Sequence, residues 1–206
     1  MAACAARSAR VLMSIEFYET NADSFIAQTA NVDMAALYQR FCRYLPEGAC
    51  ILDAGCGSGR DALAFRTMGY DVMAFDASPK MVEAARKRAG VPVYQMTFED
   101  ITFEQTFDGI WACASLLHVP RTQLSAVLRS IASLLKPKAV LYASFKYGDE
   151  ERNKDGRYFN DLDEERLAKH IEEVPNLNAA EVWTTDDRRP GRAEERWLNS
   201  LLACGG

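Results

Sequence analysis

Apolar positions along the chain follow two different periods. Over residues 31–45 they recur at helical spacing, with Met34, Leu37 and Phe41 on one face and Pro46 just past the end. Elsewhere they form short runs rich in β-branched and aromatic residues, which predict strands. In chain order the predicted strands are 49–53, 71–75, 91–96, 107–113, 139–145, 178–185 and 196–203, and the predicted helices are 31–45, 59–68, 79–89, 120–135 and 163–174.

Strands and helices alternate over most of this pattern, which predicts a parallel sheet with right-handed crossovers. The last two strands have no helix between them, so we expect them to pair as an antiparallel hairpin at one edge. The 206 residues suit one domain with a full core, and they contain no internal repeat or low-complexity linker. The predicted fold class is therefore α/β: a Rossmann-like, mostly parallel sheet of seven strands with helices on both faces.

A glycine-rich segment, Leu-Asp-Ala-Gly-Cys-Gly-Ser-Gly-Arg, follows the first strand and ends at Arg60. Gly55 allows a sharp turn off the strand, and Gly57 and Gly59 keep side chains away from a ligand on the backbone. The next helix directs its free N–H groups toward the same ligand. A dinucleotide loop would have a third glycine where Arg60 stands. The segment therefore predicts a nucleotide-type pocket, in which Asp53 suits a ligand that carries positive charge near the loop.

A second acidic residue supports this interpretation. The run from Tyr70 to Phe75 is apolar and β-rich, and Asp76 follows it directly. An acid at the end of the second strand, roughly 20 residues past the glycines, can accept hydrogen bonds from both ribose hydroxyls.

These motifs resemble those of class I S-adenosylmethionine (SAM)-dependent methyltransferases. The resemblance rests on the glycine loop with Asp76, on Phe-Asp-Gly-Ile at 107–110 and on Leu-His-Val-Pro at 117–120, and it extends from about Phe17 to Leu202. It implies the strand order 3-2-1-4-5-7-6, SAM as the cofactor and S-adenosylhomocysteine as the product. Within the superfamily, the loop and the short C-terminal part are similar to small bacterial enzymes described as tellurite-resistance-like.

The resemblance also implies which residues hold the cofactor. Asp76 would bind the ribose, residues 96–100 would surround the adenine, and the backbone carbonyl of Cys113 would accept from the SAM ammonium. Tyr18 lies in a segment similar to the N-terminal helix that covers the pocket, so residues 13–46 are predicted to form lid helices. The predicted cofactor-binding residues are Tyr18, Asp53, Gly55, Gly57, Gly59, Arg60, Asp76, Thr97, Phe98 and Cys113.

Methyl transfer from a sulfonium requires alignment of the reacting atoms more than acid–base catalysis. If the reaction uses a general base, His118 is the residue best placed by sequence. The alternative is a histidine that packs at the start of a helix.

Basic residues recur where an acceptor would enter, and Lys146, Arg157, Arg188 and Arg192 would suit an anionic small molecule. The alternative is mutual ion pairing, because four arginines face four acids between residues 186 and 196.

Composition disfavours several function classes. A net charge of −5 lacks the basic footprint of proteins that bind duplex DNA or bulk RNA. No apolar run approaches the ~20 residues of a membrane span. The chain has only two histidines and no Cys-x-x-Cys pair, which argues against a zinc site. The cysteines suit free thiols in a reducing compartment, so we expect a cytoplasmic location; they are Cys4, Cys42, Cys50, Cys56, Cys113 and Cys204.

Residues 1–12 contain arginine, are rich in alanine and lack acids. They fit either a weak organelle-targeting segment or an extension upstream of a natural start at Met13. We predict the second: a disordered extension over 1–12, followed by one domain over 13–206.

The leading hypothesis is a SAM-dependent methyltransferase for a small molecule, with anionic acceptors among the candidates. The alternative is a non-catalytic SAM-binding or partner-binding module on the same fold. A nicotinamide oxidoreductase is disfavoured because Arg60 replaces a glycine. Base methylation in nucleic acids is disfavoured because Ala-Ser-Leu-Leu at 114–117 replaces the usual Asp/Asn-Pro-Pro-Tyr-type motif. We expect no nucleic-acid partner and no membrane association, and the sequence leaves the oligomeric state open.

Overall fold

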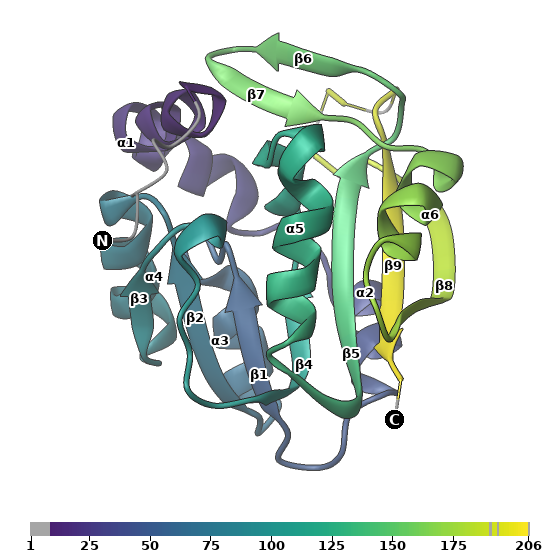
Figure 1. Cartoon of the computed structure of the whole chain (residues 1–206). Helices are drawn as coiled ribbons and strands as arrows, with labels where there is room; N and C mark the ends of the chain where they lie inside the picture. Colours follow the sequence, from purple (N-terminus) through teal and green to yellow (C-terminus); the bar gives the residue numbers. More distant parts are fainter. Residues whose placement is uncertain (1–8, 190, 193, 206) are drawn as a thin grey trace, which may run out of the picture.

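A central sheet with helices on both faces, and a separate hairpin beyond one end of it, make up the chain (Figure 1). The computed structural model describes residues 9–189, 191–192 and 194–205. The elements are α1 (Ala9–Thr29), α2 (Ala35–Cys42), β1 (Cys50–Ala54), α3 (Arg60–Thr67), β2 (Asp71–Asp76), α4 (Pro79–Ala89), β3 (Val93–Gln95), η1 (Phe98–Asp100), β4 (Phe107–Ala112), η2 (Leu116–His118), α5 (Arg121–Ala132), β5 (Leu135–Lys146), β6 (Glu151–Lys154), β7 (Arg157–Asn160), α6 (Glu164–Glu172), β8 (Leu177–Asp186) and β9 (Arg196–Cys204).

The main sheet has the strand order β3-β2-β1-β4-β5-β9-β8. Strands β1 to β5 pair in parallel, whereas β9 runs antiparallel to both β5 and β8. Since β8 and β9 are the sixth and seventh predicted strands, the predicted order 3-2-1-4-5-7-6 and the C-terminal antiparallel pair are confirmed. The carboxyl ends of β1, β2 and β4 therefore meet at one edge of the sheet, where ligands bind in open α/β folds.

Alternation of side chains along each central strand builds two cores. On β1, Leu52 belongs to the core that contains residues of α5 and α6, while its neighbour Ile51 belongs to the core on the opposite face, which contains residues of α2, α3 and α4. The same switch occurs on β4 between Ile110 and Trp111. Figure 1 shows α5 and α6 in front of the sheet and α2 and α3 behind it. Trp111 is fully buried and stacks on Tyr142 of β5, with ring centroids 3.9 Å apart.

The start of β5 differs from its prediction. The predicted helix over 120–135 ends at Ala132, and β5 begins already at Leu135, which pairs with Phe107. The Phe107 N–H donates to the carbonyl of Leu134 at 2.8 Å, so the chain begins to pair with β4 directly after the helix ends.

Helix α1 begins at Ala9, so the prediction of a disordered extension is wrong for residues 9–12; residues 1–8 lie outside the described part. Two contacts explain the order. Arg10 forms an ion pair with Glu151 at 2.8 Å, and the buried Ser14 hydroxyl accepts from the Tyr158 N–H at 3.1 Å. Helix α1 is thereby held against the β6–β7 hairpin, which the hydrophobic pattern did not predict.

Candidate functional site

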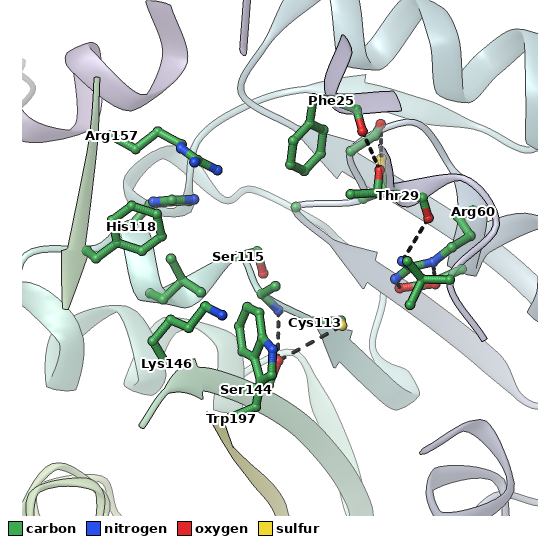
Figure 2. Close-up of a pocket in the computed structure, with 18 of the residues that line it drawn as sticks. Phe25, Thr29, Arg60, Cys113, Ser115, His118, Ser144, Lys146, Arg157 and Trp197 are labelled. Carbon is green, nitrogen blue, oxygen red and sulfur yellow. Dashed lines mark hydrogen bonds and ion pairs between the residues drawn. The ribbon is translucent and has the colours of Figure 1, made fainter. Parts of the chain in front are cut away.

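A cavity of about 470 Å³ opens at the carboxyl ends of β1, β2 and β4. Its walls come from α1, the glycine loop, η2, the β6–β7 hairpin and the segment between β8 and β9 (Figure 2). The volume lies within the range usual for small-ligand sites, and the position is the topological switch point between β1 and β4.

The glycine loop forms one side of this cavity. Gly55, Gly57 and Gly59 all have left-handed backbones, with φ of 76°, 52° and 77°. A Cβ added at Gly57 would meet no atom within 4 Å, although the residue lines the cavity. A Cβ added at Gly59 would lie 2.9 Å from the Cα of Ala85. Gly57 therefore leaves room for a ligand, whereas Gly59 allows α3 and α4 to pack closely.

Asp76 ends β2 beside this loop. Its Oδ2 accepts from the Gly57 N–H at 2.8 Å, and its Oδ1 accepts from the Ser78 N–H at 2.9 Å. Burial raises the pKa of Asp76, and the two N–H donors offset part of that effect. Each carboxylate oxygen keeps a further lone pair that a ligand hydroxyl can use. The structure therefore brings Asp76 into the cavity wall, fixed in orientation by the loop.

The segment after β3 lines the next part of the cavity, where the adenine was expected. Thr97 is buried, and its hydroxyl donates to Asp100 at 2.9 Å. Phe98 lies edge-on to Phe75, with ring centroids 5.2 Å apart. The structure thus brings both Thr97 and Phe98 to the cavity, together with Met96.

Two residues near the loop, Asp53 and Arg60, are not placed as a ligand contact would require. Asp53 is 2% exposed, and it lies under the loop rather than in the cavity wall. Its Oδ2 has no hydrogen-bond partner among the described residues, and burial raises its pKa well above the usual range. Arg60 does line the cavity, but its guanidinium already donates to both carboxylate oxygens of Asp61, at 2.5 and 2.9 Å.

Asp61 is a site residue that the sequence analysis missed. It is 6% exposed and also accepts from the Tyr38 hydroxyl at 2.6 Å and from the Trp111 indole N–H at 2.8 Å. Burial alone would raise its pKa, but the charge and hydrogen bonds of Arg60, together with the hydrogen bonds from Tyr38 and Trp111, hold the pKa below its usual value. An acid in the first turn of a helix is ordinarily explained by a favourable contact with the helix dipole. The position of Asp61 next to Arg60 was the one signal in the sequence that could have indicated this ion pair.

The end of β4 contributes backbone groups. Ala114 has a left-handed φ of 53°, which is unusual for a residue other than glycine, and its N–H donates to the Ser144 hydroxyl at 2.8 Å. Cys113 lines the cavity, and burial raises the pKa of its thiol to about 12. The thiol is therefore neutral near pH 7 and does not act as a nucleophile there.

His118 is held by hydrogen bonds at both ring nitrogens. Nδ1 lies 2.7 Å from the carbonyl oxygen of Tyr158, which can only accept, so Nδ1 carries the proton. Nε2 then accepts from the Tyr18 hydroxyl at 2.9 Å. Burial lowers the pKa of His118 to about 4, so the ring is neutral near pH 7. This arrangement favours the packing alternative: His118 orients Tyr18, and it is a poor direct base.

Three of the four predicted acceptor-binding cations are ion-paired. Lys146 is buried and lies 2.7 Å from Asp187, and it also contacts Glu195. Arg192 pairs with the same Glu195 at 3.2 Å. The exposed Arg188 reaches across to Asp33, also at 3.2 Å. For these residues the alternative of mutual ion pairing describes the structure.

Arg157 differs from the other three. It is 8% exposed, and within the described ranges no carboxylate lies within ion-pairing distance of its guanidinium. Its Nε has no hydrogen-bond partner among those residues. The guanidinium stacks 4.3 Å from the ring centroid of Phe17 and 5.1 Å from that of Phe159. Figure 2 shows it directed toward the cavity beside His118.

The described residues contain neither a candidate metal site nor a candidate membrane span. No group of three or more His, Cys, Asp or Glu side chains there could hold a metal ion. No described helix is both long enough and apolar enough to cross a membrane.

Comparison with known proteins agrees with this geometry. Residues 51–138 match the family model described as a methyltransferase domain. A ubiquinone biosynthesis O-methyltransferase of Xanthomonas axonopodis pv. citri is 38% identical over 109 residues, which cover 50% of this chain and 45% of that relative. A second one, from Xanthomonas campestris pv. campestris, is 36% identical over 104 residues, or 47% of this chain and 43% of that protein. The matched region thus spans less than half the length of these curated relatives.

Solved structures share the whole fold. The 1,6-didemethyltoxoflavin-N1-methyltransferase of Burkholderia thailandensis, bound to its substrate and S-adenosylhomocysteine, aligns with a TM-score of 0.75 at 22% identity over 95% of this chain and 88% of that chain. The magnesium protoporphyrin IX methyltransferase of Synechocystis, with bound SAM, aligns with a TM-score of 0.63 at 20% identity over 97% of this chain and 86% of that one. The narrower resemblance to tellurite-resistance-like enzymes stays a prediction. The chain therefore has a methyltransferase-domain match over residues 51–138 and the fold of structures that bind SAM or S-adenosylhomocysteine.

Proposed function

We propose that the chain transfers the methyl group of SAM to a small anionic molecule. The observation that carries the proposal is the open space over Gly57, beside the carboxylate of Asp76 and in one cavity with the unpaired Arg157. The first two features suit a nucleoside with ribose hydroxyls, and the third suits a negatively charged second ligand. The names of the relatives and of the aligned structures add support for small-molecule methylation.

The residues present fit SAM at the loop. Asp76 would accept from the ribose hydroxyls, Thr97 and Phe98 would border the adenine, and the backbone at Cys113 would face the ammonium group. When bound, SAM would supply a methyl group that its sulfonium already activates. Arg60 is paired with Asp61, and the carboxyl group of Asp76 lies in the cavity wall beside the loop, which suits a ligand with net positive charge.

Arg157 would hold the acceptor in its ionised form. A guanidinium keeps its charge at any physiological pH and stabilises a neighbouring oxyanion or carboxylate. His118, with a pKa near 4 and both nitrogens occupied, is weakly basic. We therefore propose that the acceptor binds as an anion and that His118 keeps the Tyr18 hydroxyl in place at the cavity wall. Lys146, Arg188 and Arg192 would shape the entrance through their ion pairs.

Calorimetry with SAM, S-adenosylhomocysteine and NAD tests the cofactor, and a methylation screen against a metabolite pool tests turnover. We expect both sulfur ligands to bind, NAD to bind far more weakly, and at least one acidic metabolite to gain a methyl group. Absence of binding by SAM and S-adenosylhomocysteine would refute the proposal. Binding without any methyl transfer would instead favour the non-catalytic module. A cytoplasmic location remains part of the proposal.

A further inference from the structure

We infer that the acceptor is a flat, largely apolar molecule that carries a single negative charge. The inference rests on the proposed function and narrows its substrate class. It depends on how charge is distributed over the cavity wall and on what lies next to the one unpaired cation.

Most lysines and arginines around the cavity already contact a carboxylate, although four of them, Lys146, Lys154, Arg189 and Arg192, share Asp187 and Glu195. Among the described residues, nine lysines and arginines line the cavity, and eight of them form an ion pair with a carboxylate. Those eight are Arg40, Arg60, Lys146, Arg152, Lys154, Arg188, Arg189 and Arg192. A ligand with several negative charges would have to compete with these carboxylates, because among the nine described cations Arg157 alone contacts no carboxylate.

Arg157 is the one described cation of the cavity wall without a carboxylate partner, and its burial favours binding of an anion. Burying a charge without a counter-charge is unfavourable, and an anion that enters the cavity removes this cost. Arg157 also has an unpaired Nε, so it can donate along one edge to a carboxylate or an oxyanion. One carboxylate or oxyanion can accept all the hydrogen bonds that this edge of the Arg157 guanidinium donates.

Next to Arg157, the cavity wall contains apolar and aromatic side chains. Phe159 lies under the Arg157 guanidinium, and Leu117 and Ile15 line the wall nearby. Figure 2 shows Phe25 across the cavity from Arg157, and Trp197 beside Lys146 below it. Flat rings on several sides favour a ligand with a flat apolar body, since such faces stack well on one another.

The inference can be tested with three probes on protein saturated with S-adenosylhomocysteine. 2-Naphthoate is a flat monoanion, 2-naphthamide is its neutral counterpart, and citrate is a polar trianion. By calorimetry we expect 2-naphthoate to bind at least ~10-fold more tightly than 2-naphthamide, the scale of one charge-assisted hydrogen bond, and citrate to bind more weakly than both. Arg157→Met should reduce the ratio between the two naphthyl probes to about one, and Arg157→Lys should restore part of it.

Controls separate this result from misfolding and from failure of the proposed function. Arg129→Ala removes an exposed arginine of α5 that does not line the cavity, and it should leave all three affinities unchanged. S-adenosylhomocysteine affinity should be the same in every variant; if the wild-type chain fails to bind it, the proposed function fails. If it binds normally, then equal affinities for the two naphthyl probes, tighter binding of citrate, or no 2-naphthoate binding at ~5 mM would each overturn the inference.

Discussion

Removal of the Asp61 carboxylate should be among the most destabilising single substitutions in the chain. In Asp61→Ala the buried Arg60 loses its counter-charge, and the Tyr38 hydroxyl and the Trp111 indole N–H lose their acceptor. Breaking a buried ion pair from one side costs about 3–5 kcal/mol. Each hydrogen bond to a charged group contributes roughly 1.5–3 kcal/mol. Because these terms overlap, we expect a loss of about 4–6 kcal/mol, a large share of a typical domain's stability.

Urea unfolding followed by tryptophan fluorescence measures this loss, since Trp111 lies at the centre of the cluster. Tyr38→Phe removes one donor only and should cost about 1.5–3 kcal/mol. Glu83→Gln breaks the exposed pair with Lys87 and should leave the unfolding midpoint unchanged.

The same cluster predicts a dependence on pH. The Asp61 pKa lies below its ordinary value of 3.8, so the unfolded chain binds this proton more tightly than the folded chain. The stabilisation is therefore complete above the unfolded pKa and disappears as the pH falls through the folded pKa. The difference between wild type and Asp61→Asn should shrink in acid. A loss below about 1 kcal/mol for Asp61→Ala at pH 7 would show that the cluster is not a major source of stability.

Three further predictions concern the cavity. Asp76→Ala should weaken S-adenosylhomocysteine binding at least ~10-fold in calorimetry, because hydrogen bonds to a charged acceptor are lost; an unchanged affinity would place the ribose elsewhere. Gly57→Val should abolish that binding while circular dichroism still shows a folded chain, because its side chain would occupy open cavity space; retained affinity would contradict the assigned ligand position. The pKa of His118 is about 4 in the folded chain and 6.5 ordinarily, so as the pH falls the unfolded chain is protonated at a higher pH than the folded chain. The free energy of unfolding should therefore decrease as the pH drops from 6.5 toward 4. His118→Gln should flatten that fall in urea titrations, and an identical slope in the variant would argue against the shift.

The part of the cavity around the glycine loop could be predicted because its signals are local. Three glycines at alternate positions and an acid at a strand end each report a backbone requirement within a few residues. Gly57 and Asp76 consequently lie together in the cavity wall, joined by a hydrogen bond. Gly59 shows the limit of this reasoning, since its close contact is with Ala85 of the next helix rather than with a ligand.

The acceptor half could not be predicted because it depends on contacts distant in sequence. Strand β6 is polar and mostly exposed, so it lacks the alternation that indicates a strand, and its order comes from pairing with β7 and packing of α1. Among the described residues, Arg157 lacks a carboxylate partner because of how the nearby acids pair in three dimensions. Asp161, for example, forms its ion pair with Arg152. The state of His118 depends on the Tyr158 carbonyl, forty residues away.

The ion-paired rim has a consequence for the speed of binding. Long-range attraction of an anion depends on the summed field of the surface; the rim cations Arg188 and Arg192 contact carboxylates, and the chain as a whole carries a net charge of −5. Encounter with an anionic acceptor should therefore proceed without electrostatic acceleration, and its association rate should change little with ionic strength. Arg157 acts only after the acceptor has entered, so its contribution falls on the dissociation rate and the residence time of the bound anion.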